Sequence, residues 1–407
     1  MLSAHDGADL YGDPLRGLPV VPVDAAHARL VADAHERVLG GRAGVVVGRA
    51  IELAGPGPRA HVVVRGQAEL GSVADTLGRG RALRIEVDAD LQQPTDPPDL
   101  GPPDGGTVDL DPVVDALAAA RSPLVLAGPG ILDALPGLHA AATAGSLGVV
   151  NTWSAKGAFD WRSPHHLATI GLQADDFALA GVHDTDLVLM TGVDEREAPP
   201  ARRGRAPSVE IPPPSLSTLA ERWWRPHEEI PMPPLRERLA AVTRDGWDRA
   251  GAPLWPSAVT LDYGRVLGSA GLVAADPGTA GFWVARTYAT LRPRSAIVPP
   301  DADRHGFSVA CATVARLRRP SRPVLAVVDG PRHPDVDALL DVAGSLGVPV
   351  GVEVWDDDGD RLDQAAHLPR AAKLANASTT TIASLAPSAD QWGPIIDAAG
   401  PVIAWVG

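Results

Sequence analysis

The sequence lacks the features that several common protein classes require. Cys311 is the single cysteine among 407 residues, which excludes an intrachain disulfide and a cysteine-rich zinc site and fits the reducing cytoplasm. No apolar run reaches the roughly 18 residues that a membrane span needs, and the first residues lack the pattern of a signal peptide. With 36 basic and 50 acidic residues, the net charge of −14 argues against non-specific binding to nucleic acid or anionic membranes.

Short catalytic motifs are also missing. The chain has no Gly-x-Ser-x-Gly elbow, no phosphate loop and no His-Glu-x-x-His sequence. The histidines lack zinc-ligand spacing, among them His165, His166, His183, His305 and His333. Hydrophobic residues make up 45% and charged residues 21%, which is typical of a globular protein.

Short apolar runs alternate with helical patterns along most of the chain. Such alternation indicates parallel strands with crossover helices, so we expect an α/β protein with stacked parallel sheets. A helix is expected over 111–121, and the expected strands include 123–127, 149–150, 187–190, 273–275, 296–298, 324–328, 348–354 and 402–406.

Proline and glycine divide the chain into segments. The stretch 92–106 is polar and rich in both residues, and 198–256 carries many prolines together with Trp223, Trp224, Trp247 and Trp255. We expect domains at 1–105, 106–200 and 261–407, with a Pro/Trp-rich linker at 201–260. The tryptophans either mark an interface or pin an irregular segment to its own core.

Two sets of residues could carry chemistry. Gly128 and Gly130 follow a strand and precede a helical pattern, so they either bring a phosphate to a helix N-terminus or serve packing. Asp329 and the run 356–358 follow two neighbouring strands, whose carboxyl ends meet at one edge of a parallel sheet. These carboxylates either hold a hard cation such as Mg²⁺ or Ca²⁺, or form a solvated acidic loop.

At this point the middle of the chain resembles a known family. The stretches 123–130 (Pro-Leu-Val-Leu-Ala-Gly-Pro-Gly), 151–159 (Asn-Thr-Trp-Ser-Ala-Lys-Gly-Ala-Phe) and 185–192 (Thr-Asp-Leu-Val-Leu-Met-Thr-Gly) are similar to the central domain of thiamine-diphosphate-dependent enzymes, particularly of the acetohydroxyacid (acetolactate) synthase type. Lys156 lies at a lysine of that family. The resemblance also leaves room for flavin adenine dinucleotide at this domain, at Gly128, Gly130 and Lys156.

The third segment resembles the diphosphate-holding domain of the same family. Asp276-Pro-Gly278 and the strand that leads into Asp329-Gly330 match its motifs, and positions 27 and 29 residues after Asp329 are Asp356 and Asp358. The resemblance implies Asp329, Asp356 and Asp358 as ligands of Mg²⁺. It implies that thiamine diphosphate lies near a second set of residues, namely Asp276, Gly278, His305, Gly306 and Gly330.

The chain departs from the family at its functional positions. Val328 replaces the first glycine of Gly-Asp-Gly, and His305 stands where the family has a bulky apolar residue. The first segment resembles a shortened pyrimidine-binding domain over 32–37 and 84–90. The activating glutamate of that domain falls near Ala25 and Ala26, where no glutamate is present. Without it the cofactor loses its proton relay.

These features predict a degenerate homologue without catalytic residues of its own. We expect a companion subunit of a heteromer with a complete paralogue, or otherwise a homo-oligomer. One alternative is an active lyase or carboligase on 2-keto acids that uses thiamine diphosphate and Mg²⁺ and takes its glutamate from a partner subunit. Another alternative is a sensor that binds an adenine dinucleotide at the middle domain.

Overall fold

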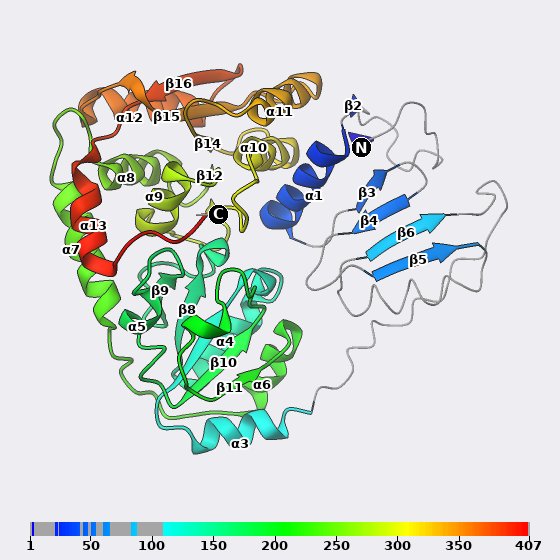
Figure 1. The fold of residues 1–407 in the computed structure, drawn as a ribbon, viewed down its shortest axis with the longest axis vertical. Coiled ribbons are helices and arrows are strands. Elements are labelled where there is room, and N and C mark those ends of the chain that lie inside the picture. Colours follow the sequence, from blue (N-terminus) through cyan, green and yellow to red (C-terminus); the bar gives the residue numbers. More distant parts are fainter. Residues whose placement is uncertain are drawn as a thin grey trace.

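The structure, a computed structural model, describes most of the chain. The described residues are 2–3, 21–22, 24–40, 44–47, 50–53, 60–65, 83–87 and 109–405. They form an α/β fold that contains two five-stranded parallel sheets, one in the middle segment and one in the third (Figure 1). This confirms the predicted fold class. Within the described residues, no helix is both long enough and apolar enough to cross a membrane.

The middle sheet has the strand order β11-β10-β7-β8-β9, and all four pairings are parallel. Its strands are β7 (Pro123–Ala127), β8 (Gly148–Thr152), β9 (His166–Ile170), β10 (Leu187–Thr191) and β11 (Ser208–Glu210). Helices α3 (Asp111–Ala119), α4 (Leu135–Gly145) and α6 (Leu216–Arg222) contribute to the core on one face, and α5 (Asp176–Leu179) contributes to the core on the other. The central strands are apolar on both sides because both faces are covered.

The third sheet has the order β13-β12-β14-β15-β16 and is also parallel throughout. Its strands are β12 (Leu272–Ala275), β13 (Ala296–Ile297), β14 (Val324–Asp329), β15 (Gly351–Asp360) and β16 (Thr381–Leu385). Alternate residues of a strand enter opposite cores: Val273 and Leu325 pack on one face, and Ala274 and Ala326 on the other.

Helices cover both faces of this sheet. One face carries α8 (Pro256–Leu267), α9 (Thr279–Thr287) and α12 (Gln364–Ala375), and the other carries α10 (Phe307–Arg318) and α11 (Pro334–Ser345). Helices α7 (Pro234–Trp247) and α13 (Trp392–Ala399) pack on each other at the side of both sheets (Figure 1). Several helices start with proline in the first turn, a position that needs no backbone N–H donor, namely α3, α4, α7, α8 and α11.

The described residues of the first segment contain a four-stranded sheet of a different kind. Its strands β3 (Gly44–Val47), β4 (Ala50–Leu53), β5 (Ala60–Val64) and β6 (Leu83–Val87) have the order β3-β4-β6-β5. The β3–β4 and β4–β6 pairs are antiparallel, unlike the parallel sheets expected from the sequence. Two residues separate β3 from β4, which is too short for a parallel crossover and suits a hairpin. Strands β1 (Leu2–Ser3) and β2 (Val21–Pro22) pair separately.

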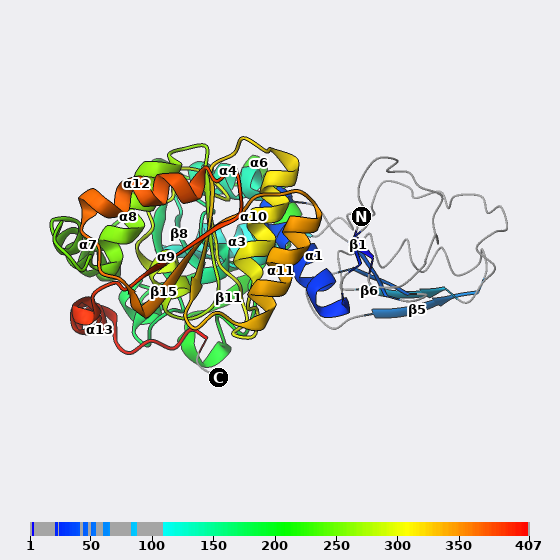
Figure 2. The ribbon, with the colours of Figure 1, turned by 90° about the horizontal axis from the view of Figure 1, so that it is seen from above.

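Helix α1 (Ala25–Leu39) lies between this sheet and the third segment (Figures 1 and 2). Leu30, Ala34 and Val38 enter the same core as α10 and α11. Arg29 donates to the buried Glu52 of β4 over 2.6 Å. The helix is therefore held by apolar packing on one side and by a charged contact on the other.

The Pro/Trp-rich region folds onto the sheets. Trp223 is buried against Gly145 of α4, and Trp255 is buried beneath the guanidinium of Arg249, 4.0 Å from the ring centre. These two tryptophans pin the region to its own core. Trp224 is instead 72% exposed.

Two expectations about strands are wrong. Residues 402–405 form no strand: Val402 makes one isolated bridge to Gln173, followed by a turn. The tail packs instead against the middle segment, where the backbone N–H of Ile403 donates to the carbonyl of Leu172 over 2.9 Å. Asp356 to Gly359 do not follow a strand but lie within β15, where the register with β16 shifts between Trp355 and Asp360. The polar residues 356–359 therefore lie in the irregular part of a strand whose first five residues are buried.

Candidate functional site

A cavity of about 260 Å³ opens at the carboxyl ends of β12 and β14. After β12 the chain forms β13 on one side of β12 and then forms β14 on the other side. The strand order therefore reverses between β12 and β14. Open α/β sheets bind ligands at such a point. The cavity is lined by Asp276, Pro277, Gly278, Ala302, His305, Asp329, Pro331, His333, Val336 and Trp405. It lies just below the roughly 300–1,000 Å³ of typical ligand pockets.

Four residues predicted from the sequence therefore meet in this cavity: Asp276, Gly278, His305 and Asp329. Sequence reasoning missed the contribution of His333 and Trp405. Proximity could have pointed to His333, since it follows Asp329 by four residues. Nothing local in the sequence points to Trp405, which the C-terminal tail brings to the cavity.

Asp329 is the last residue of β14 and caps the helix that starts beside it. Its carboxylate accepts hydrogen bonds from the backbone N–H of Thr279 over 2.6 Å and of Ala280 over 2.8 Å. These amides belong to the first turn of α9, which has no partners for them within the helix. Burial raises the pKa of Asp329 to about 6, against the opposing effect of the two amides.

Asp276 has the equivalent role at the neighbouring strand. It directly follows β12 and accepts from the backbone N–H of Gly306 over 2.6 Å and of Ser308 over 2.8 Å, at the start of α10. Its pKa is also raised to about 6, chiefly by burial and to a lesser degree by the charge of Asp329. Both carboxylates are ionised at neutral pH and face one cavity.

Two stacked imidazoles form another wall. The rings of His305 and His333 lie 4.3 Å apart and nearly parallel. Burial and the neighbouring His333 lower the pKa of His305 below its ordinary value. His333 also lies 3.3 Å from Asp335, which in turn lies 3.3 Å from His27 of α1. The wall of the cavity is thus continuous with the contact between α1 and α11.

The predicted metal ligands do not all converge. Asp356 and Asp358 belong to the bulge of β15 and are absent from the cavity lining, and Asp356 accepts from the backbone N–H of Asp358 over 3.2 Å. Both carboxylate oxygens of Asp329 accept from amides of α9. Among the residues that the structure describes, no three His, Cys, Asp or Glu side chains are arranged to hold a metal ion.

The space beside each glycine predicted to hold a diphosphate is occupied by other atoms of the chain. The space beside Gly278 in which a Cβ would stand is taken by the Asp329 carboxylate, and the equivalent space at Gly330 by Asp356. At Gly306 that space holds the side chain of Leu339 and the backbone of Asp335. The cavity carboxylates already accept backbone amides, the lining has no lysine or arginine, and no three described side chains are arranged for a metal, so the described residues do not fit a diphosphate with its metal ion.

Gly128 and Gly130 lie at the reversal point of the middle sheet, between β7 and β10. The amide of Gly128 donates to the carbonyl of Thr191 over 3.0 Å, and that of Gly130 to the carbonyl of Gly192 over 2.9 Å. A Cβ on either glycine would collide with the backbone at Gly192. Both glycines therefore serve close packing of two loops, and their amides are already used. This leaves the predicted phosphate contact without donors at this turn.

Lys156 lies away from the cavity, in the buried turn after β8. Burial lowers its pKa to about 7, and the charge of Arg286 acts in the same direction. Lys156 also contributes to the low pKa of His166, about 3, for which burial is the main cause. The environment of Lys156 therefore disfavours its charge.

The expected position of the activating glutamate is the start of α1. Ala25 is the first helical residue, and the preceding Asp24 accepts from the backbone N–H of Ala26 over 2.8 Å and of His27 over 3.0 Å. Asp24 also contacts the His27 ring. Asp24 therefore acts as a helix cap, and no carboxylate stands at Ala25 or Ala26.

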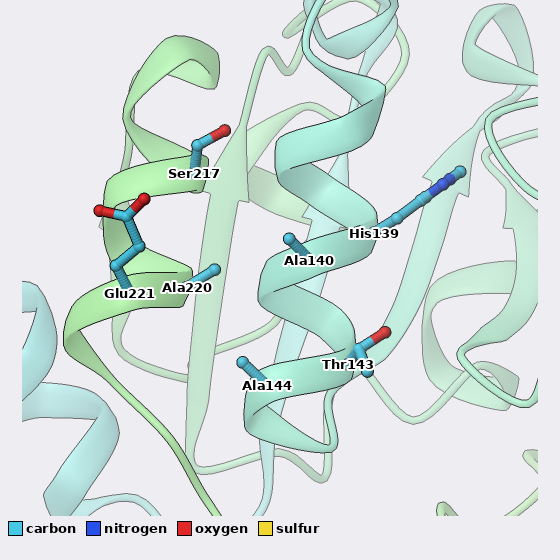
Figure 3. Close-up of a pocket in the computed structure, with 7 residues that line it drawn as sticks. All are labelled: His139, Ala140, Thr143, Ala144, Ser217, Ala220 and Glu221. Atoms are coloured by element: carbon cyan, nitrogen blue, oxygen red, sulfur yellow. The ribbon is translucent and has the colours of Figure 1, made fainter.

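A larger depression of about 570 Å³ lies between α4 and α6, but it is shallow, and three of its seven lining residues are alanine (Figure 3). His139 points away from α6 in Figure 3, and its Nε2 lies 2.7 Å from the carbonyl oxygen of Ala158. Thr143, Ser217 and Glu221 supply the polar groups at this surface. Their spread along two helices gives no convergent set of polar atoms.

A buried polar network behind the third sheet escaped the sequence analysis. His367 of α12 lies 2.9 Å from Asp262 and 3.2 Å from Glu353, and all three are fully buried. The hydroxyl of Tyr263 donates to Glu353, and Arg370 donates to Glu353 over 3.1 Å. Although burial opposes the charge, the two carboxylates raise the pKa of His367 to about 9. The network links three elements, α8, β15 and α12.

Comparison with known families assigns the middle segment. Residues 110–211 match the family described as the central domain of thiamine pyrophosphate enzymes, which supports a relationship to that enzyme family. The matched range covers 102 of the 407 residues, from just before α3 to just after β11. It agrees with the resemblance of the middle segment. The name of the family implies the use of thiamine diphosphate by its members.

Proposed function

We propose that this chain is a degenerate relative of the thiamine-diphosphate enzymes, of the acetolactate synthase type, and that it serves as a non-catalytic companion subunit. The observation that carries the proposal is that groups of the chain itself occupy the binding positions of the third-segment cavity. Its glycines face the chain's own side chains, and its carboxylates are bound to α9 and α10. The start of α1 also offers alanine where the resemblance calls for glutamate.

Calorimetric titration of the purified full chain with thiamine diphosphate and Mg²⁺ tests whether the cofactor binds. We expect no detectable heat, because a diphosphate would have to displace two hydrogen-bonded carboxylates. Micromolar or tighter binding would overturn the non-catalytic assignment. It would instead support an active carboligase or lyase on 2-keto acids that borrows a glutamate from a partner.

Co-expression with a complete thiamine-diphosphate enzyme from the same genome tests the companion role. We expect the two chains to co-elute in size-exclusion chromatography at a mass that contains both. As a control, each chain is run alone on the same column. Separate elution of the two chains from the co-expressed sample contradicts the companion role.

A further inference from the structure

Two of the helices that begin at the third-segment cavity, α9 and α10, are capped by carboxylates of the chain. The first-turn amides of a helix are the groups that bind phosphate in many α/β proteins, because they point outward and carry partial positive charge. Here Asp329 takes the amides of Thr279 and Ala280, and Asp276 takes those of Gly306 and Ser308. These four amides are therefore occupied, and at α11, the third helix that begins at the cavity, the backbone N–H of Asp335 donates to the His333 ring.

The charge of the cavity lining also disfavours the binding of an anion. None of its ten lining residues, all within the described residues of the chain, is a lysine or an arginine. A diphosphate that entered would meet two carboxylates without a protein cation to offset them, and like charges at short range repel. Asp276 is almost fully buried, whereas Asp329 is partly accessible from the cavity. Asp329 is thus the carboxylate that a ligand would meet first.

We infer that Asp329, supported by Asp276, excludes phosphate-bearing ligands from this cavity by occupying the N-terminus of α9 in place of an anion. This inference deepens the proposed function and rests on it, since it names the residues that keep the cofactor out. It also implies a latent anion site. Removal of the Asp329 carboxylate leaves the amides of Thr279 and Ala280 free beside the cavity.

The test is a titration of inorganic pyrophosphate, without metal, into the wild-type chain and into Asp329→Ala at pH 8. We expect no binding to the wild type and measurable binding to the variant, with an affinity at least tenfold above the wild-type limit. Asp329→Ser has one neutral side-chain oxygen in place of two charged ones, so it leaves at least one of the two α9 amides free and keeps the test valid if the alanine variant fails to fold. It should also gain pyrophosphate binding.

Asp363→Ala is the matched control. Asp363 caps α12 by accepting from the backbone N–H of Ala366 over 2.9 Å, but it does not line the cavity. Gain of binding in this control would overturn the inference, because any uncapped helix would then suffice. Equal pyrophosphate binding by the wild type and Asp329→Ala would overturn it as well. Folded Asp329 variants that bind nothing would contradict the role of Asp329, while the result with thiamine diphosphate and the companion role would stand.

Discussion

At the scale of single residues, burial lowers the pKa of two buried cationic groups, His367 and Lys156, but their charged neighbours act in opposite directions. His367 lies between Asp262 and Glu353, and these two carboxylates hold its proton against the effect of burial. Lys156 has Arg286 nearby, and its pKa is lowered. Because the native pKa moves up in one case and down in the other, the two groups give the free energy of unfolding pH dependences of opposite sign.

His367 should stabilise the fold most at low pH. Its native pKa of about 9 lies above the ordinary 6.5, so its contribution is complete below pH 6.5 and is lost as the pH rises through 9. A shift of this size corresponds to about 3 kcal/mol. We expect the difference in unfolding free energy between the wild type and His367→Gln to shrink by that order between pH 6.5 and 9.5, measured by urea unfolding. A pH-independent difference would contradict the assignment of charge to His367.

Lys156 should behave in the opposite way. Its native pKa of about 7 lies below the ordinary 10.5, so the folded state is penalised at low pH, and the penalty fades as the pH rises from 7 toward 10.5. Lys156→Met keeps the length of the side chain and removes the amine. We expect this variant to be more stable than the wild type by a few kcal/mol at pH 6, with the advantage fading by pH 10. An exposed-lysine control, Lys373→Met, should change stability by less than about 0.5 kcal/mol.

At the scale of elements, glycine has different meanings at different places in a helix. Gly145 ends α4, and a Cβ there would overlap the indole of Trp223. Gly264 lies inside α8 with nothing within 4 Å of the place its Cβ would take. Sequence patterns treat both as weak helix positions, but only the first is a packing requirement.

Alanine substitutions at these two glycines should change the free energy of unfolding in opposite directions. Gly264→Ala should raise the free energy of unfolding by about 0.5–1 kcal/mol, because alanine is the better helix former and meets no neighbour. Gly145→Ala should lower it by about 1–3 kcal/mol, because Trp223 must move out of its site. Urea unfolding of both variants, and of the pair Gly145→Ala with Trp223→Ala, measures this. In the double variant the cost of Gly145→Ala should disappear; if it persists, the clash is not the cause.

At the scale of the whole molecule, one buried ion pair joins the middle and third segments. Arg286 of α9 donates to both carboxylate oxygens of Asp176 over 2.9 and 2.8 Å and to the carbonyl of Thr169 over 3.0 Å. Asp176 also accepts from the backbone N–H of Leu172 and Gln173. Gln173 in turn donates to the carbonyl of Ile395 within α13 and to that of Gly400 directly after the helix. The two sheets are therefore tied by a buried polar contact rather than by apolar packing alone.

Breaking this pair should weaken the association of the two sheets. Asp176→Ala leaves Arg286 buried without its partner and should lower the free energy of unfolding by about 3–5 kcal/mol. The double variant Asp176→Leu with Arg286→Met removes both charges and should recover most of that loss, since an apolar pair of similar volume is often as stable. Urea unfolding, monitored by circular dichroism, measures the free energy of unfolding of both variants. A double variant as unstable as Asp176→Ala would show that the hydrogen bonds to the backbone matter more than the unpaired charge.

Much of the architecture follows from the sequence. Runs such as 123–127 and 324–328 are apolar throughout because both faces of a parallel strand are covered, so their position and class could be read directly. The match of residues 110–211 agrees with the resemblance that their motifs carried. Asp276, Gly278, His305 and Asp329 could be placed together because neighbouring parallel strands end at one edge.

What the side chains at that edge do was decided only by the tertiary structure. Residue type cannot tell whether Asp329 faces a ligand or the amides of α9, because both uses require an acceptor at the same strand end. Likewise, Gly128 suits either a phosphate or the backbone of Gly192. The tail at 402–405 is apolar enough for a strand, but it packs against the middle segment at Leu172 and Gln173. Local sequence thus determined most of the central strands, whereas the partners of each polar group depended on segments far apart in the chain.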